Sequence, residues 1–100
     1  MSSREKLSDE NIDDFVATHP GWTRKGNALC RSFQFPDYSS ALAFVVRVSL
    51  AAEKRDHHPD VLLGWGRAEV SWSTHDAGGI TAFDTSMAEA TDKLYGSQRA

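Results

Sequence analysis

The chain has 100 residues, of which 40% are hydrophobic and 25% are charged, and its formal net charge is −3 at pH 7. This length and composition are typical of one globular domain with a modest hydrophobic core. The negative charge argues against a nucleic-acid backbone as a partner, because binding to phosphates needs a basic surface.

No segment predicts export or a membrane span. Residues 1–6 are polar and lack an apolar signal-peptide core, and the apolar run over residues 41–52 is interrupted by polar side chains and too short to cross a bilayer. The single cysteine, Cys30, has no partner for an internal disulfide, which fits a reducing compartment. We therefore expect one cytoplasmic domain over residues 1–100, with residues 1–6 as a flexible tail.

A first helix is predicted from residue 8 onward. Ser8 is a favoured N-cap residue, and His19-Pro20-Gly21 ends the segment. The apolar positions recur at helical spacing: Leu7, Ile12, Phe15 and Val16. His19 is then a surface residue near the end of the helix rather than a functional group.

Two strands follow, over residues 22–25 and 28–35. The Gly26-Asn27 pair between them suits a tight hairpin turn. Alternation along the second strand places Phe33 on one face and Cys30 on the other. We interpret Cys30 as a small packing residue, because no activating base is close to it in the sequence.

A long helix is predicted over about residues 37–56, with Asp37 as its N-cap. It ends before Pro59, because a proline disfavours helical geometry at the residue that precedes it. Apolar side chains occur nearly all round this helix, whereas one sheet covers only one side of it. We therefore expect an oligomer that is held together partly by this helix.

Two further strands are predicted over residues 61–65 and 68–74, with a turn at Gly66-Arg67. In the second of these strands apolar and polar side chains alternate, so one face suits packed helices and the other is open. A loop at Gly78-Gly79 leads to a last helix that begins at Thr81 or Asp84.

The resulting order of elements is α-β-β-α-β-β-α. Two hairpins joined by a long helix predict the α+β class, a four-stranded antiparallel sheet with the three helices on one face.

Three of the four histidines lie where an element ends. His57 and His58 follow the long helix, and His75 follows the last strand. If the last two strands are neighbours, the three imidazoles converge on one pocket. Nearby carboxylates are available to orient them: Glu53, Asp56 and Asp60. Because imidazole titrates near neutrality and can give or accept a proton, this pattern predicts acid–base chemistry.

Two other interpretations stay open at this point. His57-His58-Pro59 can be a polar helix terminus without a function. Three histidines and a carboxylate can also ligate zinc. Against zinc, the chain has no His-x-x-x-His pair, and the side chains of adjacent histidines usually diverge.

A longer pattern surrounds these histidines. Glu53-x-x-x-His57-His58-Pro59 is followed by Trp65, by Thr74-His75-Asp76 and by Asp84, and Phe35-Pro36-Asp37-Tyr38 precedes the long helix. These residues and spacings resemble the pterin-4a-carbinolamine dehydratase family over about residues 7–96.

The resemblance implies a fold, an assembly and a reaction. The fold is the same four-stranded antiparallel sheet with three helices on one face, in a homodimer or homotetramer built through the helix over residues 37–56 and a sheet edge. The reaction is dehydration of 4a-hydroxytetrahydropterin to quinonoid dihydropterin, which recycles tetrahydrobiopterin. The pterin is the substrate, and the resemblance implies neither a metal nor an organic cofactor, and neither a nucleic-acid nor a membrane partner.

It also implies roles for individual residues. His57 and His75 match the catalytic histidines of the family and are candidates for the acid and the base, in an order that the sequence leaves open. His58 holds or assists the pterin, and Asp56 and Glu53 orient imidazoles or meet the ring. The segments that line the substrate are His57-His58-Pro59 and Thr74-His75-Asp76-Ala77.

Three positions need separate interpretation. Many relatives have an aromatic residue soon after the His-His-Pro motif, where this chain has Val61. Trp65 either compensates by stacking on the pterin or packs within the protein. Asp84 belongs to the pattern, and we interpret it as a cap of the last helix.

The same resemblance includes a second class of function. Some relatives act as transcriptional coactivators by contacting the helices of a transcription factor, and others assist the assembly of Rubisco. Such a protein-binding module can keep part of the motif without turnover. Here the three histidines and Asp56 are all present, which favours the enzyme.

Overall fold

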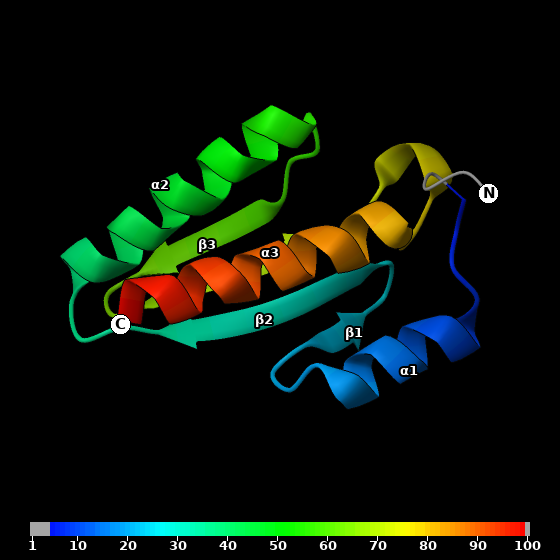
Figure 1. Ribbon diagram of the computed structural model, residues 1–100, viewed down its shortest axis with the longest axis horizontal. Helices are drawn as coiled ribbons and strands as arrows, with labels where there is room; N and C mark the ends of the chain where they lie inside the picture. The colour runs from blue at the N-terminus through cyan, green and yellow to red at the C-terminus, as the bar shows by residue number, and fades with distance from the viewer. Residues whose placement is uncertain (1–4, 100) are drawn as a thin grey trace.

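The computed structural model describes residues 5–99 and has the predicted order of helices and strands (Figure 1). The elements are α1 (Asp9–Thr18), β1 (Thr23–Lys25), β2 (Ala28–Gln34), α2 (Tyr38–Arg55), β3 (Asp60–Gly64), β4 (Arg67–Trp72) and α3 (Ala82–Arg99). A short 3₁₀ turn that was not predicted, η1 (His75–Ala77), precedes α3. Within the predicted tail, residues 1–4 lie outside the described residues, and Lys6 forms an isolated antiparallel bridge with Thr81.

The sheet has four antiparallel strands in the order β1-β2-β4-β3, so β1 and β3 are its edges. The apolar face of β4 is buried as predicted, with Ala68, Val70 and Trp72 each 0% exposed. α2 and α3 cover this face, and α1 lies beside β1 (Figure 1). The predicted α+β class, a four-stranded antiparallel sheet with three helices on one face, is therefore confirmed.

Two tryptophans fix α3 on the sheet. Trp72 is fully buried, and its indole N–H donates to the hydroxyl of Thr91 at 3.1 Å. The indole N–H of Trp22 donates to the carboxylate of Asp92 at 2.9 Å. Because a buried indole N–H is costly without an acceptor, these bonds fix where α3 crosses the strands.

Capping determines both ends of α2. The carboxylate of Asp37 accepts the backbone N–H of Ser40 at 2.7 Å, which is the predicted N-cap. At the other end Asp56 takes a left-handed conformation, with φ 49°, and its N–H reaches the carbonyls of Ala52 and Glu53. This ending is a common helix stop, and it turns the chain towards β3 just before Pro59.

Asp37 is expected to make stability depend on pH. The Ser40 N–H donates to this carboxylate and holds the pKa of Asp37 below its ordinary value. Because the folded pKa is the lower one, the stabilisation is complete above the unfolded pKa and is lost as the pH falls through the folded pKa. Asp37→Asn keeps an acceptor but does not titrate. The difference in melting temperature between the wild type and this variant should therefore become smaller as the pH falls. A difference that stays constant with pH would contradict this.

No helix within residues 5–99 is long and apolar enough to span a membrane. The outer side of α2 nevertheless carries a row of half-exposed apolar side chains: Tyr38, Leu42, Val46 and Leu50. This row, the α2 stripe, lies opposite the buried side that contains Phe44 and Val48. The predicted excess of apolar surface on the long helix is thus present.

Candidate active site

The end of α2 and the η1 turn lie at the same end of the sheet (Figure 1). The backbone N–H of His57 donates to the carbonyl of Ala52 at 3.2 Å, which holds the chain against the last turn of α2. On the other side, Thr74 and Gly79 form an antiparallel bridge that closes a tight loop carrying His75. Two segments that are distant in the sequence are therefore fixed beside each other.

These segments enclose a cavity of about 210 Å³. Its lining residues are Asp56, His57, His58, Ser73, Thr74, His75 and Asp76. The three imidazoles that the sequence analysis singled out thus line one cavity, because β3 and β4 are neighbours in the sheet.

His57 is the most enclosed of the histidines around the cavity. Its Nε2–H donates to the Oδ1 of Asp84 at 2.6 Å, and the two side chains are 14% and 0% exposed. A carboxylate only accepts hydrogen bonds, so the proton lies on Nε2 and Nδ1 is the second ring nitrogen. Asp84 therefore selects the tautomer of His57 and fixes the direction of its Nε2–H.

Asp84 is itself held by donors on its other oxygen. Its Oδ2 accepts the hydroxyl of Thr74 and the backbone N–H of Thr81, each at 2.8 Å. The hydroxyl of Thr81 in turn accepts the N–H of Phe83, so Thr81 and Asp84 form a capping box at the start of α3. The interpretation of Asp84 as a helix cap is correct but incomplete, because the same carboxylate also orients His57.

Aromatic rings fix the plane of the His57 imidazole. Trp72 stacks near it at 5.8 Å between ring centroids and 13° between planes, and Phe83 at 5.5 Å and 23°. With Nε2 on Asp84, these contacts leave the imidazole little freedom to rotate. The histidine is preorganised, as a proton-transfer group needs to be.

His58 has a different environment. Its Nε2–H donates to the carboxylate of Glu53 at 2.5 Å, and the two side chains are 53% and 73% exposed. An exposed contact of this kind contributes little to stability, so its effect is on the direction of the ring. Glu53 thus holds the ring of His58, although it does not line the cavity.

The remaining predicted residues are placed as follows. His75 is exposed at the start of η1, and Asp76 follows it along the cavity wall. Asp56 lines the cavity and caps α2, and the carboxylate that meets His57 is Asp84 instead. Pro59 and Ala77 are adjacent in sequence to lining residues but are not among them, whereas Ser73 lines the cavity and was missed.

Within residues 5–99, no three His, Cys, Asp or Glu side chains are grouped closely enough to hold a metal ion. Instead, two carboxylates each hydrogen-bond a different imidazole: Asp84 bonds to His57, and Glu53 bonds to His58. The arrangement can hold protons at fixed positions and transfer them.

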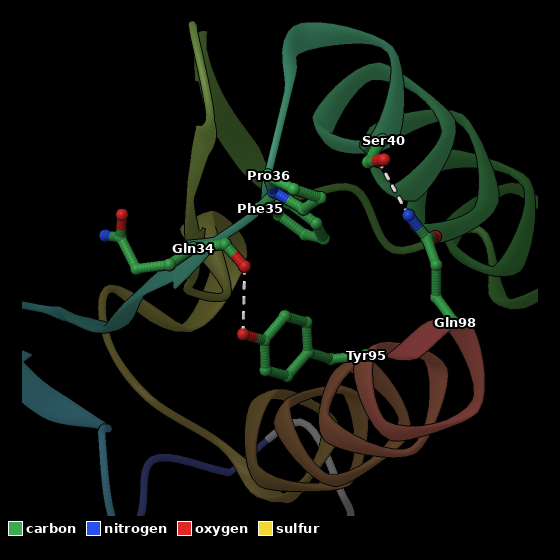
Figure 2. A pocket seen from close by; sticks show the side chains of 6 residues that line it. All are labelled: Gln34, Phe35, Pro36, Ser40, Tyr95 and Gln98. Carbon is green, nitrogen blue, oxygen red and sulfur yellow. Dashed lines mark hydrogen bonds between the residues drawn. The ribbon is translucent and has the colours of Figure 1, made fainter. Parts of the chain in front are cut away.

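A larger cavity, of about 460 Å³, lies at the other end of α2 (Figure 2). It is lined by Gln34, Phe35, Pro36, Ser40, Tyr95 and Gln98. The Tyr95 hydroxyl donates to the Gln34 carbonyl at 2.9 Å, and the Gln98 amide donates to the Ser40 carbonyl at 2.6 Å. Its lining has no imidazole or carboxylate, so the smaller cavity is the one suited to proton transfer.

Comparisons with known proteins identify the family of this chain. Residues 5–94 match the family model described as pterin 4 alpha carbinolamine dehydratase. The chain belongs to this family. It is 43% identical over 89 residues to a Roseiflexus sp. (strain RS-1) protein named "Putative pterin-4-alpha-carbinolamine dehydratase", covering 89% of this chain and 96% of that one. A Rhizorhabdus wittichii (strain RW1) protein of the same name is 46% identical over 94 residues, covering 92% and 97%.

Two solved structures share the fold. A transcriptional coactivator/pterin dehydratase from Brucella melitensis has a TM-score of 0.87 and 32% identity, covering 92% of this chain and 100% of that one. A pterin dehydratase-like protein identified as a RuBisCO assembly factor in the alpha-carboxysome has a TM-score of 0.62 and 21% identity, covering 75% and 87%. The second likeness shows the fold alone.

Proposed function

We propose that this pterin dehydratase family member is an active hydro-lyase that converts 4a-hydroxytetrahydropterin to quinonoid dihydropterin. The observation that carries the proposal is the meeting of three imidazoles in one cavity, with His57 held on a buried carboxylate. A protein-binding module has no need for a preorganised imidazole.

The reaction needs two proton transfers. The C–O bond at C4a breaks, and the oxygen leaves as water once it has received a proton, because hydroxide is a poor leaving group. A ring nitrogen gives up its proton as the C=N bond forms. We assign these transfers to His57 and His75, which lie on the two segments that form the cavity. Each positioned acid or base contributes about 10²–10⁴-fold.

Asp84 supports His57 in this scheme. When Nδ1 of His57 takes up a proton, the ring becomes a cation, and the adjacent carboxylate stabilises it. Asp84 also prevents the ring from presenting Nε2 to the substrate. His58, directed by Glu53, and Asp56 are placed to hold the pterin.

The rest of the proposal follows from this chemistry. Proton transfer by imidazoles needs neither a metal nor an organic cofactor, and the product is the form that re-enters tetrahydrobiopterin recycling. We place the reaction in the cytoplasm, which fits the free thiol of Cys30.

The test is a stopped-flow assay of carbinolamine dehydration with the purified protein. We expect a rate well above that of the uncatalysed reaction, unchanged by a metal chelator. A rate equal to the uncatalysed one would assign the protein to the binding-module class. A rate that falls with chelator would contradict the metal-free mechanism.

We also propose that the chain is a homo-oligomer in which the α2 stripe is covered. Val46→Lys combined with Leu50→Lys should weaken this assembly without unfolding α2, because both side chains are exposed and lysine is a good helix former. Light scattering at micromolar concentration should show a smaller particle than the wild type. Ala17→Lys, at an exposed position of α1, is the matched control and should leave the mass unchanged. A wild type that is a stable monomer would contradict the proposal.

A further inference from the structure

Trp65 is 72% exposed, more than any other described large apolar side chain. It lies with Gly66 in the turn between β3 and β4, at the opposite end of β3 from His57 and His58. At about 3.3 Å per strand residue the separation from His58 is about 20 Å. The indole therefore cannot reach the cavity of its own chain.

The cavity is small, and its lining has no large aromatic side chain. Its volume of about 210 Å³ is below the range of about 300–1,000 Å³ that is usual for small-molecule sites. None of its described lining residues is Phe, Tyr or Trp. Trp72, which stacks near the far side of His57, is fully buried and offers no surface to a ligand. Apart from the imidazoles, a flat heterocycle would find no aromatic face among these lining residues.

The outer edge of β3 is unpaired in the described chain. β3 pairs only with β4, and Leu62 on its open face is 54% exposed. An edge strand of this kind presents free N–H and C=O groups to another strand. The α2 stripe lies on the helix that packs against β3 (Figure 1). A second copy, related by a two-fold axis through this edge, is the occupant that the open strand suits.

The residues of β3 favour one register for this pairing, with Leu62 opposite the partner's Leu62. The two exposed leucines then cover each other at the axis. Asp60 lies opposite the partner's Gly64. Arg67 lies over Gly64, with its Nε 2.9 Å from the point where a Cβ would be. Each Asp60 therefore faces the partner's Arg67, which also donates to Glu69 of its own chain at 2.8 Å, one such group on each side of the axis.

The neighbouring registers with the same two-fold symmetry pair the side chains less favourably. They place Leu62 opposite Asp60 or opposite Gly64, which leaves the leucine uncovered and separates the charges. Opposite side chains in an antiparallel pair lie about 4.5–5.5 Å apart, so each mismatch removes a direct side-chain contact.

In the favoured register Trp65 lies opposite the partner's Pro59, immediately after the partner's His57 and His58. We propose that Trp65 of each subunit forms the missing aromatic wall of its partner's cavity, where it stacks on the pterin ring. The proposal rests on the proposed function for the identity of the ligand. It makes the site incomplete in a single chain.

The test is a mixture of two impaired variants, Trp65→Ala and His57→Gln, after subunit exchange. In a mixed dimer one cavity lacks both residues, whereas the other has its own His57 and the tryptophan of its partner. Random exchange should therefore restore about a quarter of the wild-type rate, if both parents are nearly inactive. If Trp65 acted on its own chain, no mixed dimer would contain a complete site.

Three controls make the outcome decisive. Trp65→Ala must remain a dimer by sedimentation, Trp65→Phe should keep most of the activity, and mass-tagged subunits must show that exchange took place. Restored activity supports the proposal. Exchanged dimers without any gain in rate overturn it, and so does a wild type that is a monomer.

A wild type without turnover would defeat the proposed function alone. In that case the probe is an oxidised, non-reacting pterin, measured by its fluorescence. Loss of a stacking wall should weaken its binding about tenfold in dimeric Trp65→Ala, with Trp65→Phe close to wild type. Leu62→Arg, which separates the subunits, should weaken it by the same amount. Equal affinity in wild type and Trp65→Ala, or no measurable binding by the wild type, overturns the proposal.

Discussion

Replacing His57 and His75 together is expected to reduce carbinolamine dehydration to the uncatalysed rate while the fold is retained. Both side chains line the same cavity, and each positioned acid or base contributes about 10²–10⁴-fold. His57→Gln combined with His75→Ala is the preferred variant, because glutamine keeps an N–H donor for the buried Asp84. Stopped-flow rates measure the loss, and circular dichroism measures the fold.

The matched control is the fourth histidine. His19 stacks on Phe15 with ring centroids 3.8 Å apart and bonds to Glu89 on α3, far from the cavity in the sequence and absent from its lining. His19→Ala should therefore keep the dehydration rate. A double variant of His57 and His75 that turns over as fast as wild type would show that the catalytic groups lie elsewhere.

Asp84→Asn is expected to impair both catalysis and stability. The asparagine cannot stabilise the His57 cation and does not select its tautomer, so turnover should fall by about 100-fold, within the range for a positioned acid or base. The fully buried carboxylate also accepts from Thr74 and Thr81, and weakening charged hydrogen bonds of this kind costs about 1–3 kcal/mol. The measurements are the pH profile of the rate and the midpoint of urea unfolding.

Thr91→Val separates the two effects. Thr91 is buried, accepts from Trp72 and donates to the carbonyl of Met87, and it is not among the residues that line the cavity. This variant should lose stability of similar size without a change in the pH profile. If Asp84→Asn behaves in the same way as Thr91→Val, Asp84 is only a helix cap and does not act through His57.

Local signals were sufficient for most of the fold. Ser8 and Asp37 cap helices where expected, since a short polar side chain that accepts a backbone N–H acts within three residues of itself. The alternation of β4 identified its buried face, because side chains of a strand point to opposite sides in turn. The η1 turn was missed, since it depends on the bridge between Thr74 and Gly79.

The sequence by itself determined the elements, the sheet class, the family and the three histidines, because caps, alternation and motif spacing are properties of neighbouring residues. Only the tertiary structure decided which carboxylate meets which imidazole. Asp56 is next to His57 in the chain but is used as a helix stop, whereas Asp84, 27 residues away, is brought to His57 by the packing of α3. The exposure of Trp65 was decided in the same way, because burial depends on what covers a side chain and not on its neighbours in sequence.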